Sequence, residues 1–185
     1  MPRFISRLFA LALLLGIFAS PLLGNGASVV VAQDAATPCA PLTEEEATAF
    51  ATAQFAAWNA HDVDAVLAQY DPSAISHFGI GFDSEGIDEI GAWQTAFFEA
   101  FPGVHGTIDR VWVAGDTVIV RYIAIGIQEA DFMGIPASQD TVTWTGINVY
   151  QLACGKIVEQ WGEADHFGRI EQQGVIPVGS PEAGA

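Results

Sequence analysis

Basic side chains are scarce in this chain. Six lysines and arginines stand against 22 aspartates and glutamates among 185 residues, which gives a formal net charge of −16. A surface of this sign repels phosphate groups, and binding to nucleic acids depends largely on their neutralisation by lysine and arginine. The composition therefore argues against nucleic acid and anionic membrane surfaces as partners. It weakly favours a neutral or cationic small ligand.

The motifs of several enzyme classes are also missing. The two cysteines and four histidines are scattered along the chain, without the close ligand spacing that is typical of a zinc site. No glycine-rich phosphate loop is present, and no serine or cysteine stands in a nucleophile elbow. We therefore expect no metal site, and the sequence argues against hydrolase and nucleotide-binding functions.

The N-terminal apolar run is too short to cross a bilayer core, which takes about 20 residues. This run, Leu8–Ala19, follows Arg3 and Arg7, and small residues recur up to Ala32. A basic start, a short apolar segment and a small-residue cleavage site are typical of a secretory signal peptide. We predict that residues 1–32 are removed and that the exported protein is not stably inserted in a membrane. An uncleaved anchor is the alternative.

Two cysteines follow the predicted signal peptide, Cys39 and Cys154. An oxidising compartment would permit them to pair. Closing so long a loop would stabilise the fold by about 4–5 kcal/mol in the chain-entropy model. Two free thiols are the open alternative, and metal binding is a weaker one.

Three helices are predicted in the first half of the domain. Thr43 and Glu46 have the spacing of a capping box, so a helix begins at this point. Asp62 can cap a second, short helix, and acidic residues favour the start of a third. The predicted helices run from Thr43 to about Asn59, from Asp62 to Asp71–Pro72, and from Ile87 to Phe101.

The second half is rich in valine, isoleucine and tyrosine, which favour strands. The predicted strands are Val104–Ala114, Thr117–Ile127, Thr141–Ala153 and Lys156–Asp165, and Ser73–Phe78 adds a short one. Helices followed by a meander indicate an α+β fold, in which a curved antiparallel sheet wraps around the N-terminal helices. Strong curvature leaves a cone whose open mouth forms a pocket for a small apolar molecule.

Seven segments form a pattern by their order and spacing: Trp58–Asp64 with Tyr70, Phe97–Pro102, Gly115–Val118, Arg121, Phe132–Pro136, Gly155–Trp161 and Asp165–Gly174. This pattern resembles the SnoaL-like polyketide cyclases of the ester-cyclase type. The likeness spans residues 43–177, after a linker at 33–42 and before a tail at 178–185 that we expect to be disordered. It implies the cone-shaped fold of the nuclear transport factor 2-like superfamily, a cystatin-like roll in which homodimers are common.

The resemblance also implies a role for Asp165. In the characterised cyclases, the carboxylate of a W-x-x-x-D-x-x-G pattern is the general acid/base for an intramolecular aldol closure, without metal or organic cofactor. Here that pattern runs from Trp161 to Gly168. Desolvation in an apolar pocket would raise the carboxyl pKa towards working pH, although Asp165 could equally cap the following turn. Where these cyclases commonly carry a histidine, this chain has Gln128, which cannot shuttle a proton.

Three further residues join Gln128 as candidates for substrate contact. Trp161 could stack on a ring, His77 could hydrogen-bond a carbonyl, and Asn59 could face the cavity. Each has a structural alternative. Trp161 could pack on the sheet, His77 could be a satisfied surface histidine, and Asn59 could terminate a helix.

Two functions follow from these observations. The first is cofactor-independent acid/base chemistry, such as cyclisation or isomerisation, on a small apolar cyclic or polyketide-like substrate, with Asp165 as the base. The second is an exported binding protein that keeps the cone and has lost the reaction, which export and Gln128 both favour. A purely structural role in dimerisation would instead predict a filled cone without a pocket.

Overall fold

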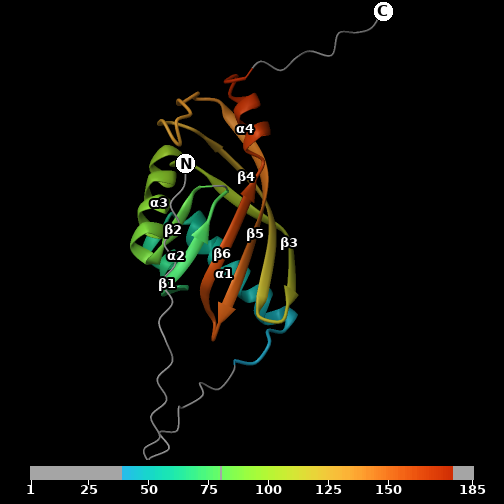
Figure 1. Ribbon diagram of the computed structural model, residues 1–185. Coiled ribbons are helices and arrows are strands. Elements are labelled where there is room, and N and C mark those ends of the chain that lie inside the picture. The colour runs from blue at the N-terminus through green and yellow to red at the C-terminus, as the bar shows by residue number, and fades with distance from the viewer. Residues whose placement is uncertain (1–38, 80, 177–185) are drawn as a thin grey trace, which may run out of the picture. The chain divides into compact units, whose positions relative to one another are not determined.

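The computed structural model describes residues 39–79 and 81–176. The predicted signal peptide and the predicted tail lie outside this part of the chain. The described residues combine four helices with one six-stranded sheet, which is curved and does not close into a barrel (Figure 1). The predicted α+β class is confirmed. No helix in the described part is long and apolar enough to cross a membrane.

Local capping decides where the first two helices begin. The Glu46 amide donates to Thr43 Oγ1 at 3.2 Å, and the Thr43 amide donates to Glu46 Oε2 at 2.8 Å, which completes the predicted capping box. Asp62 accepts a hydrogen bond from the Ala65 amide in a similar way. The helices are α1 (Glu44–Asn59), α2 (Val63–Leu67), α3 (Gly86–Ala100) and α4 (His166–Gln172).

The sheet has the strand order β2-β1-β6-β5-β4-β3. Its strands are β1 (Tyr70–His77), β2 (Asp83–Glu85), β3 (His105–Ala114), β4 (Thr117–Ile127), β5 (Thr141–Ala153) and β6 (Lys156–Ala164). Neighbouring strands run antiparallel except β1 and β6, which run parallel. The predicted antiparallel meander is present in β3 to β6, and β1 joins it through a parallel pair that was not predicted. A parallel pair needs a long crossover, which the chain between β1 and β6 supplies.

Two further details differ from the sequence-based expectation. The second helix ends at Leu67, because Tyr70 begins β1 and pairs with Ile157 of β6. Long-range pairing of this kind outweighs the local helical spacing. Strand β2 has three residues and α4 has seven, so both are too short to show a periodic pattern and neither was predicted.

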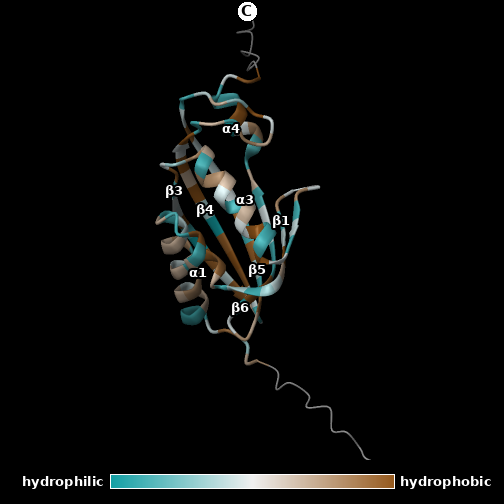
Figure 2. Cartoon of the chain, turned by 90° about the vertical axis from the view of Figure 1, so that its left-hand side faces the viewer, coloured by the Kyte–Doolittle hydropathy of each residue, from teal (hydrophilic) through white to brown (hydrophobic). Residues whose placement is uncertain are grey.

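Strand alternation separates a covered face of the sheet from an exposed one. On β4, Val118, Val120 and Ala124 are fully buried, whereas Ile123 and Ile125 are 40% and 46% exposed. Helices α1 and α3 pack against the sheet (Figure 2). The buried side chains form one cluster that includes α1 and a second that includes α3. Residues of both clusters border a hollow, which is the candidate site.

A disulfide fastens the segment that precedes α1. It joins Cys39 to Cys154 in the turn between β5 and β6, with 5.2 Å between the two Cα atoms, a usual separation for a disulfide. The Leu42 amide donates to the Gly115 carbonyl in the turn between β3 and β4 at 3.0 Å. The start of the domain is therefore tied to two turns of the sheet.

Candidate functional site

A chamber opens between the covered face of the sheet and helices α1, α3 and α4. Its cavity volume is about 90 Å³, and the hollow reaches about 860 Å³ when the open space at its mouth is included. Aromatic side chains form much of its wall, and amides and phenols form its floor. The open chamber argues against the purely structural alternative, which predicts a filled cone.

One wall is a stack of aromatic rings. The ring centres of Phe78 and Trp93 are 4.1 Å apart with 4° between the planes, and those of Trp93 and Phe97 are 5.5 Å apart with 5° between the planes. Phe132 meets Trp93 edge-on at 5.9 Å. Parallel ring faces attract a further planar ring by offset stacking or edge contacts. This wall therefore suits a planar cyclic ligand.

Two glycines make room for rings against the sheet. A Cβ atom on Gly146 would lie 2.3 Å from Cζ of Tyr122, and one on Gly162 would lie 2.6 Å from Cδ1 of Phe78. Gly146 directly opposes Tyr122 in the register of β4 and β5. Side-chain carbons do not approach so closely, so glycine at these positions lets both rings border the chamber.

The floor of the chamber is polar but uncharged. Tyr70 Oη donates to Gln160 Oε1, and Asn148 Nδ2 donates to Tyr150 Oη at 2.9 Å. Burial raises the pKa of Tyr70 and the pKa of Tyr150 well above the ordinary value of a phenol. Burial also raises the pKa of Tyr122 to about 12. The phenols therefore stay protonated at physiological pH and act as hydrogen-bonding groups rather than bases.

The described residues that line the chamber include no aspartate or glutamate and two basic side chains, His166 and Arg169. His166 is the first residue of α4 and is exposed, although it also borders the chamber. Desolvation, together with the positive charge of Arg169, lowers the pKa of His166 below 6.5. Its imidazole is therefore neutral at physiological pH and able to accept a proton. Arg169 is buried.

Asp165 lies outside the chamber lining and takes the capping role that was its structural alternative. It is exposed, and its Oδ1 accepts a hydrogen bond from the Gly168 amide at 2.8 Å, which caps α4. A Cβ atom on Gly168 would lie 2.4 Å from Oδ2 of Asp165. Glycine is therefore needed for this approach, and the cap accounts for the D-x-x-G spacing.

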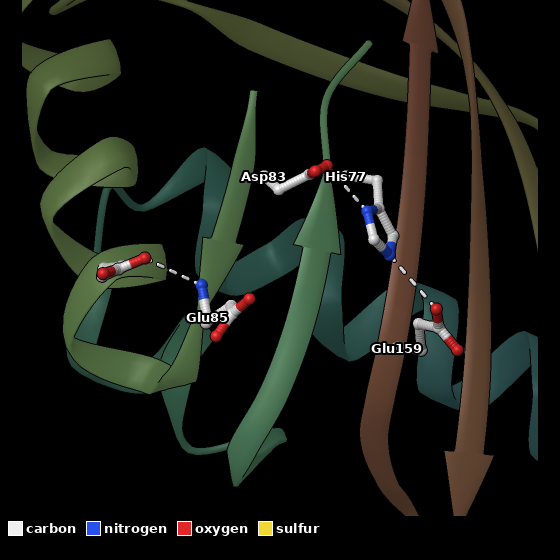
Figure 3. A network of polar contacts seen from close by, with 5 residues as sticks. His77, Asp83, Glu85 and Glu159 are labelled. Atoms are coloured by element: carbon white, nitrogen blue, oxygen red, sulfur yellow. Dashed lines mark hydrogen bonds and ion pairs between the residues drawn. The ribbon is translucent and has the colours of Figure 1, made fainter. Parts of the chain in front are cut away.

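Trp161 and His77 lie on the sheet surface, away from the chamber lining. Their rings stack at 5.6 Å across the parallel pair of β1 and β6. His77 lies between two carboxylates: Nδ1 is 2.7 Å from Asp83 Oδ1, and Nε2 is 3.1 Å from Glu159 Oε1 (Figure 3). Gly162 lines the chamber, so alternation turns the adjacent Trp161 outwards. Both residues follow their structural alternatives.

The two carboxylates make His77 a pH-dependent contributor to stability. Hydrogen bonding to Asp83, and then to Glu159, raises the pKa of His77 above 6.5. A group whose pKa is higher in the folded protein stabilises it below the unfolded pKa, and this effect is lost as pH rises through the raised value. We expect H77Q to lower the free energy of unfolding at mildly acidic pH by less than about 1 kcal/mol, as for a partly exposed ion pair. Urea unfolding between about pH 5 and 8 measures this difference, and a difference independent of pH would contradict it.

Asn59 and Gln128 are engaged in structural contacts. Asn59 donates to the Gly106 carbonyl at 2.9 Å and accepts from the Gly106 amide at 2.7 Å, which fastens the end of α1 to β3. Gln128 is fully buried, donates to two carbonyls of the 130–135 loop, and accepts from Gln173 Nε2 at 2.7 Å. Neither side chain lines the chamber, so neither is placed to contact a ligand there.

Only some of the residues that line the chamber could be identified from the sequence. Alternation along β5 places Trp144, Asn148 and Tyr150 on one face, and this pattern can be read from the sequence. His166 and Arg169 could not be found in this way. They lie on a seven-residue helix, whose placement over the sheet depends on tertiary contacts.

Comparisons with known proteins place the chain among relatives of similar fold. The family model of the SnoaL-like domain matches residues 51–160. A candidate SnoaL-like polyketide cyclase from Jannaschia sp. CCS1 is 25% identical, with a TM-score of 0.65 over 71% of this chain and 93% of that chain. AclR, a candidate hydroxylase from Streptomyces galilaeus, is 19% identical, with a TM-score of 0.65 over 73% of this chain and 100% of that chain. A search of the curated proteins found no match.

The fold itself is shared more widely. A protein with a ketosteroid isomerase-like fold from Catenulispora acidiphila, in complex with trimethylamine, is 19% identical, with a TM-score of 0.60 over 69% of this chain and 93% of that chain. This is the fold predicted for the chain. The relatives include a candidate cyclase and a candidate hydroxylase, so the fold alone does not determine the reaction.

Proposed function

Because the chain belongs to the SnoaL-like family, we propose that it binds a small, largely apolar cyclic molecule and catalyses proton transfer on it without a cofactor, as cyclisation or isomerisation requires. The candidate cyclase from Jannaschia shares the fold. The stack of Phe78, Trp93 and Phe97 suits a planar ring. The protonated phenols of the floor can hydrogen-bond to a ligand carbonyl.

The proposal rests on the position of His166 in the chamber lining and on its lowered pKa. Among the described residues that line the chamber, His166 is the one whose ordinary pKa lies near neutrality, and its lowered pKa favours the base form. A neutral imidazole can remove a proton from a carbon next to a carbonyl. The electron pair then forms an enolate, and the imidazolium returns the proton to the oxygen or to another carbon. We therefore assign the role of base to His166 rather than Asp165, which caps the helix that carries it.

A nitrobenzisoxazole tests for a base in an apolar chamber, because removal of its ring proton opens the ring to a coloured phenolate. We expect the wild-type protein to open this compound faster than buffer, and H166A to lower the rate by about a hundredfold. The wild-type rate should rise with pH and level off, with a midpoint below 6.5, because the deprotonated imidazole is the active form and its pKa is lowered. Absorbance of the phenolate measures the rate.

Two control variants make this test specific. D165N keeps a side chain that caps helices about as well as aspartate does, so it should retain the rate. H105A removes an exposed histidine of β3 that does not line the chamber, and it should retain the rate as well. A loss of rate in D165N, combined with full activity in H166A, would return the role of base to Asp165.

A second candidate function is binding without a reaction. It is favoured by the absence of a carboxylate from the described chamber lining, since the resemblance implies a carboxylate base. Quenching of tryptophan fluorescence by the nitrobenzisoxazole, with no ring opening above the buffer rate, would support this function over the first.

We also propose that the protein is exported. The disulfide between Cys39 and Cys154 supports an oxidising compartment, while the predicted signal peptide lies outside the described residues. Cleavage before Gln33 predicts the first residue of the mature chain, and a secreted chain that still begins at Met1 would contradict the cleavage.

A further inference from the structure

We propose that the ligand of the chamber carries a carboxylate, which pairs with Arg169 while the ligand ring lies against the stacked aromatic wall. The substrate class is therefore a planar cyclic carboxylic acid. This inference rests on the proposed role of the chamber as the ligand site, and it is independent of whether His166 acts as a base.

Arg169 is a buried cation without a counter-charge. It is 2% exposed and lines the chamber from α4. Within residues 39–79 and 81–176, no salt bridge includes it, and its Nε and Nη2 atoms have no hydrogen-bond partner. Its guanidinium carbon lies 5.3 Å from the ring centre of Phe101 and 5.9 Å from that of Trp144. The rings hold the guanidinium by cation–π contact but offer its N–H groups no acceptor.

An unpaired charge in such a place is unfavourable. Burial lowers the pKa of Arg169, yet a guanidinium keeps its proton under physiological conditions. The charge therefore stays, and buried charges in proteins are as a rule paired and hydrogen-bonded. Nε and Nη2 have almost no accessible surface, so an acceptor can reach the guanidinium only through the small part of Arg169 that lines the chamber. The chamber that Arg169 lines is the space in which such an acceptor can bind.

A carboxylate is the acceptor that fits this group best. Its negative charge and its two oxygens complement the positive charge and the N–H groups of a guanidinium. The chain itself does not provide it, since no aspartate or glutamate is among the described residues of the lining. A ligand carboxylate would supply the counter-charge that the lining lacks, while the ligand ring lies against Phe78, Trp93 and Phe97.

A carboxylate ligand differs in charge from the neutral or cationic ligand that the composition weakly favours. The net charge of −16 favoured a neutral or cationic ligand, but the acids do not line the chamber in the described part of the chain. Charges farther away than about 10 Å are largely screened by salt when they are exposed. The nearby guanidinium therefore decides the sign of ligand that the chamber prefers.

The test compares two naphthalenes of nearly equal shape, naphthoate and acetylnaphthalene, through their quenching of tryptophan fluorescence. We expect the wild-type protein to bind naphthoate at least about tenfold more tightly. Replacing Arg169 with glutamine should weaken naphthoate binding about tenfold to a hundredfold and weaken acetylnaphthalene binding less, because a ketone oxygen accepts a hydrogen bond but carries no charge. The matched control is R121Q, which removes an exposed arginine paired with Asp109 and should change neither affinity.

Equal affinity of the wild-type protein for both naphthalenes, or an equal loss of both in R169Q, would overturn this inference and leave the chamber as the ligand site. Failure of both compounds to bind would overturn the proposed function together with the inference. R169K is a second variant for the case that R169Q does not fold. Lysine keeps the positive charge and lacks only the planar arrangement of donors. R169K should retain part of the preference for naphthoate, and a complete loss of preference in a folded R169K that still binds acetylnaphthalene would count against charge pairing.

Discussion

A chain in which Cys39 and Cys154 are both replaced by serine is expected to lose about 4–5 kcal/mol of unfolding free energy. The two cysteines are 115 residues apart in the sequence, so their bond closes a loop that spans most of the domain. Opening the loop raises the entropy of the unfolded chain, whereas the other contacts of the folded domain remain. Since domains are stable by about 5–15 kcal/mol in total, the loss would be a large fraction of the stability.

Urea unfolding with and without a reductant measures this effect. The wild-type protein should fall to the stability of the double-serine variant when its disulfide is reduced, and the variant should not respond to the reductant. An unchanged unfolding midpoint of the wild-type protein, with two thiols titrated per chain, would contradict the prediction.

Replacing Gly146 with valine is expected to destabilise the fold by about 1–3 kcal/mol and to abolish ligand binding. The new Cβ would lie 2.3 Å from Cζ of Tyr122, so the phenol ring must move away from the sheet. Tyr122 borders the chamber, so its displaced ring would take up part of the space proposed for the ligand. Urea unfolding and a fluorescence titration with naphthoate measure the two effects.

Thr145→Val is the matched control for this substitution. Thr145 precedes Gly146 on β5 and is exposed on the opposite face of the sheet. Valine is as favourable as threonine in a strand, so the control should change stability by less than about 0.5 kcal/mol and leave binding intact. Naphthoate affinity of wild-type strength in G146V would show that the Tyr122 ring does not occupy the ligand space.

The fold was predictable wherever local physics decides the structure. The capping box of Thr43 and Glu46 begins α1 at the predicted place, because its hydrogen bonds involve only neighbouring residues. The strands Thr117–Ile127 and Thr141–Ala153 have their predicted bounds, because turns and alternation mark them. Tyr70 shows the limit. Its helical spacing is present in the sequence, but pairing with β6 places it in a strand, and no local pattern reveals so distant a partner.

The candidate site was less predictable, because it depends on which residues meet in space. The family resemblance implies a catalytic role for Asp165, whereas in the structure its carboxylate caps α4, the alternative that the same spacing allows. Trp161 faces outwards because the register of β6 places Gly162 in the chamber lining. A register shift of one residue would turn Trp161 towards the chamber and Gly162 away from it. His166 and Arg169 enter the site through the docking of α4, which the sequence does not specify locally.

Gln128 joins the 130–135 loop to Gln173 at the end of α4. The loop contributes Phe132 to the chamber wall, and α4 contributes His166. Because the Gln128 amide is fully buried, separating either segment from it leaves polar groups without partners, so the two segments open together. A substitution at Gln128 would therefore disturb the aromatic wall and α4 together, although its own side chain does not line the chamber.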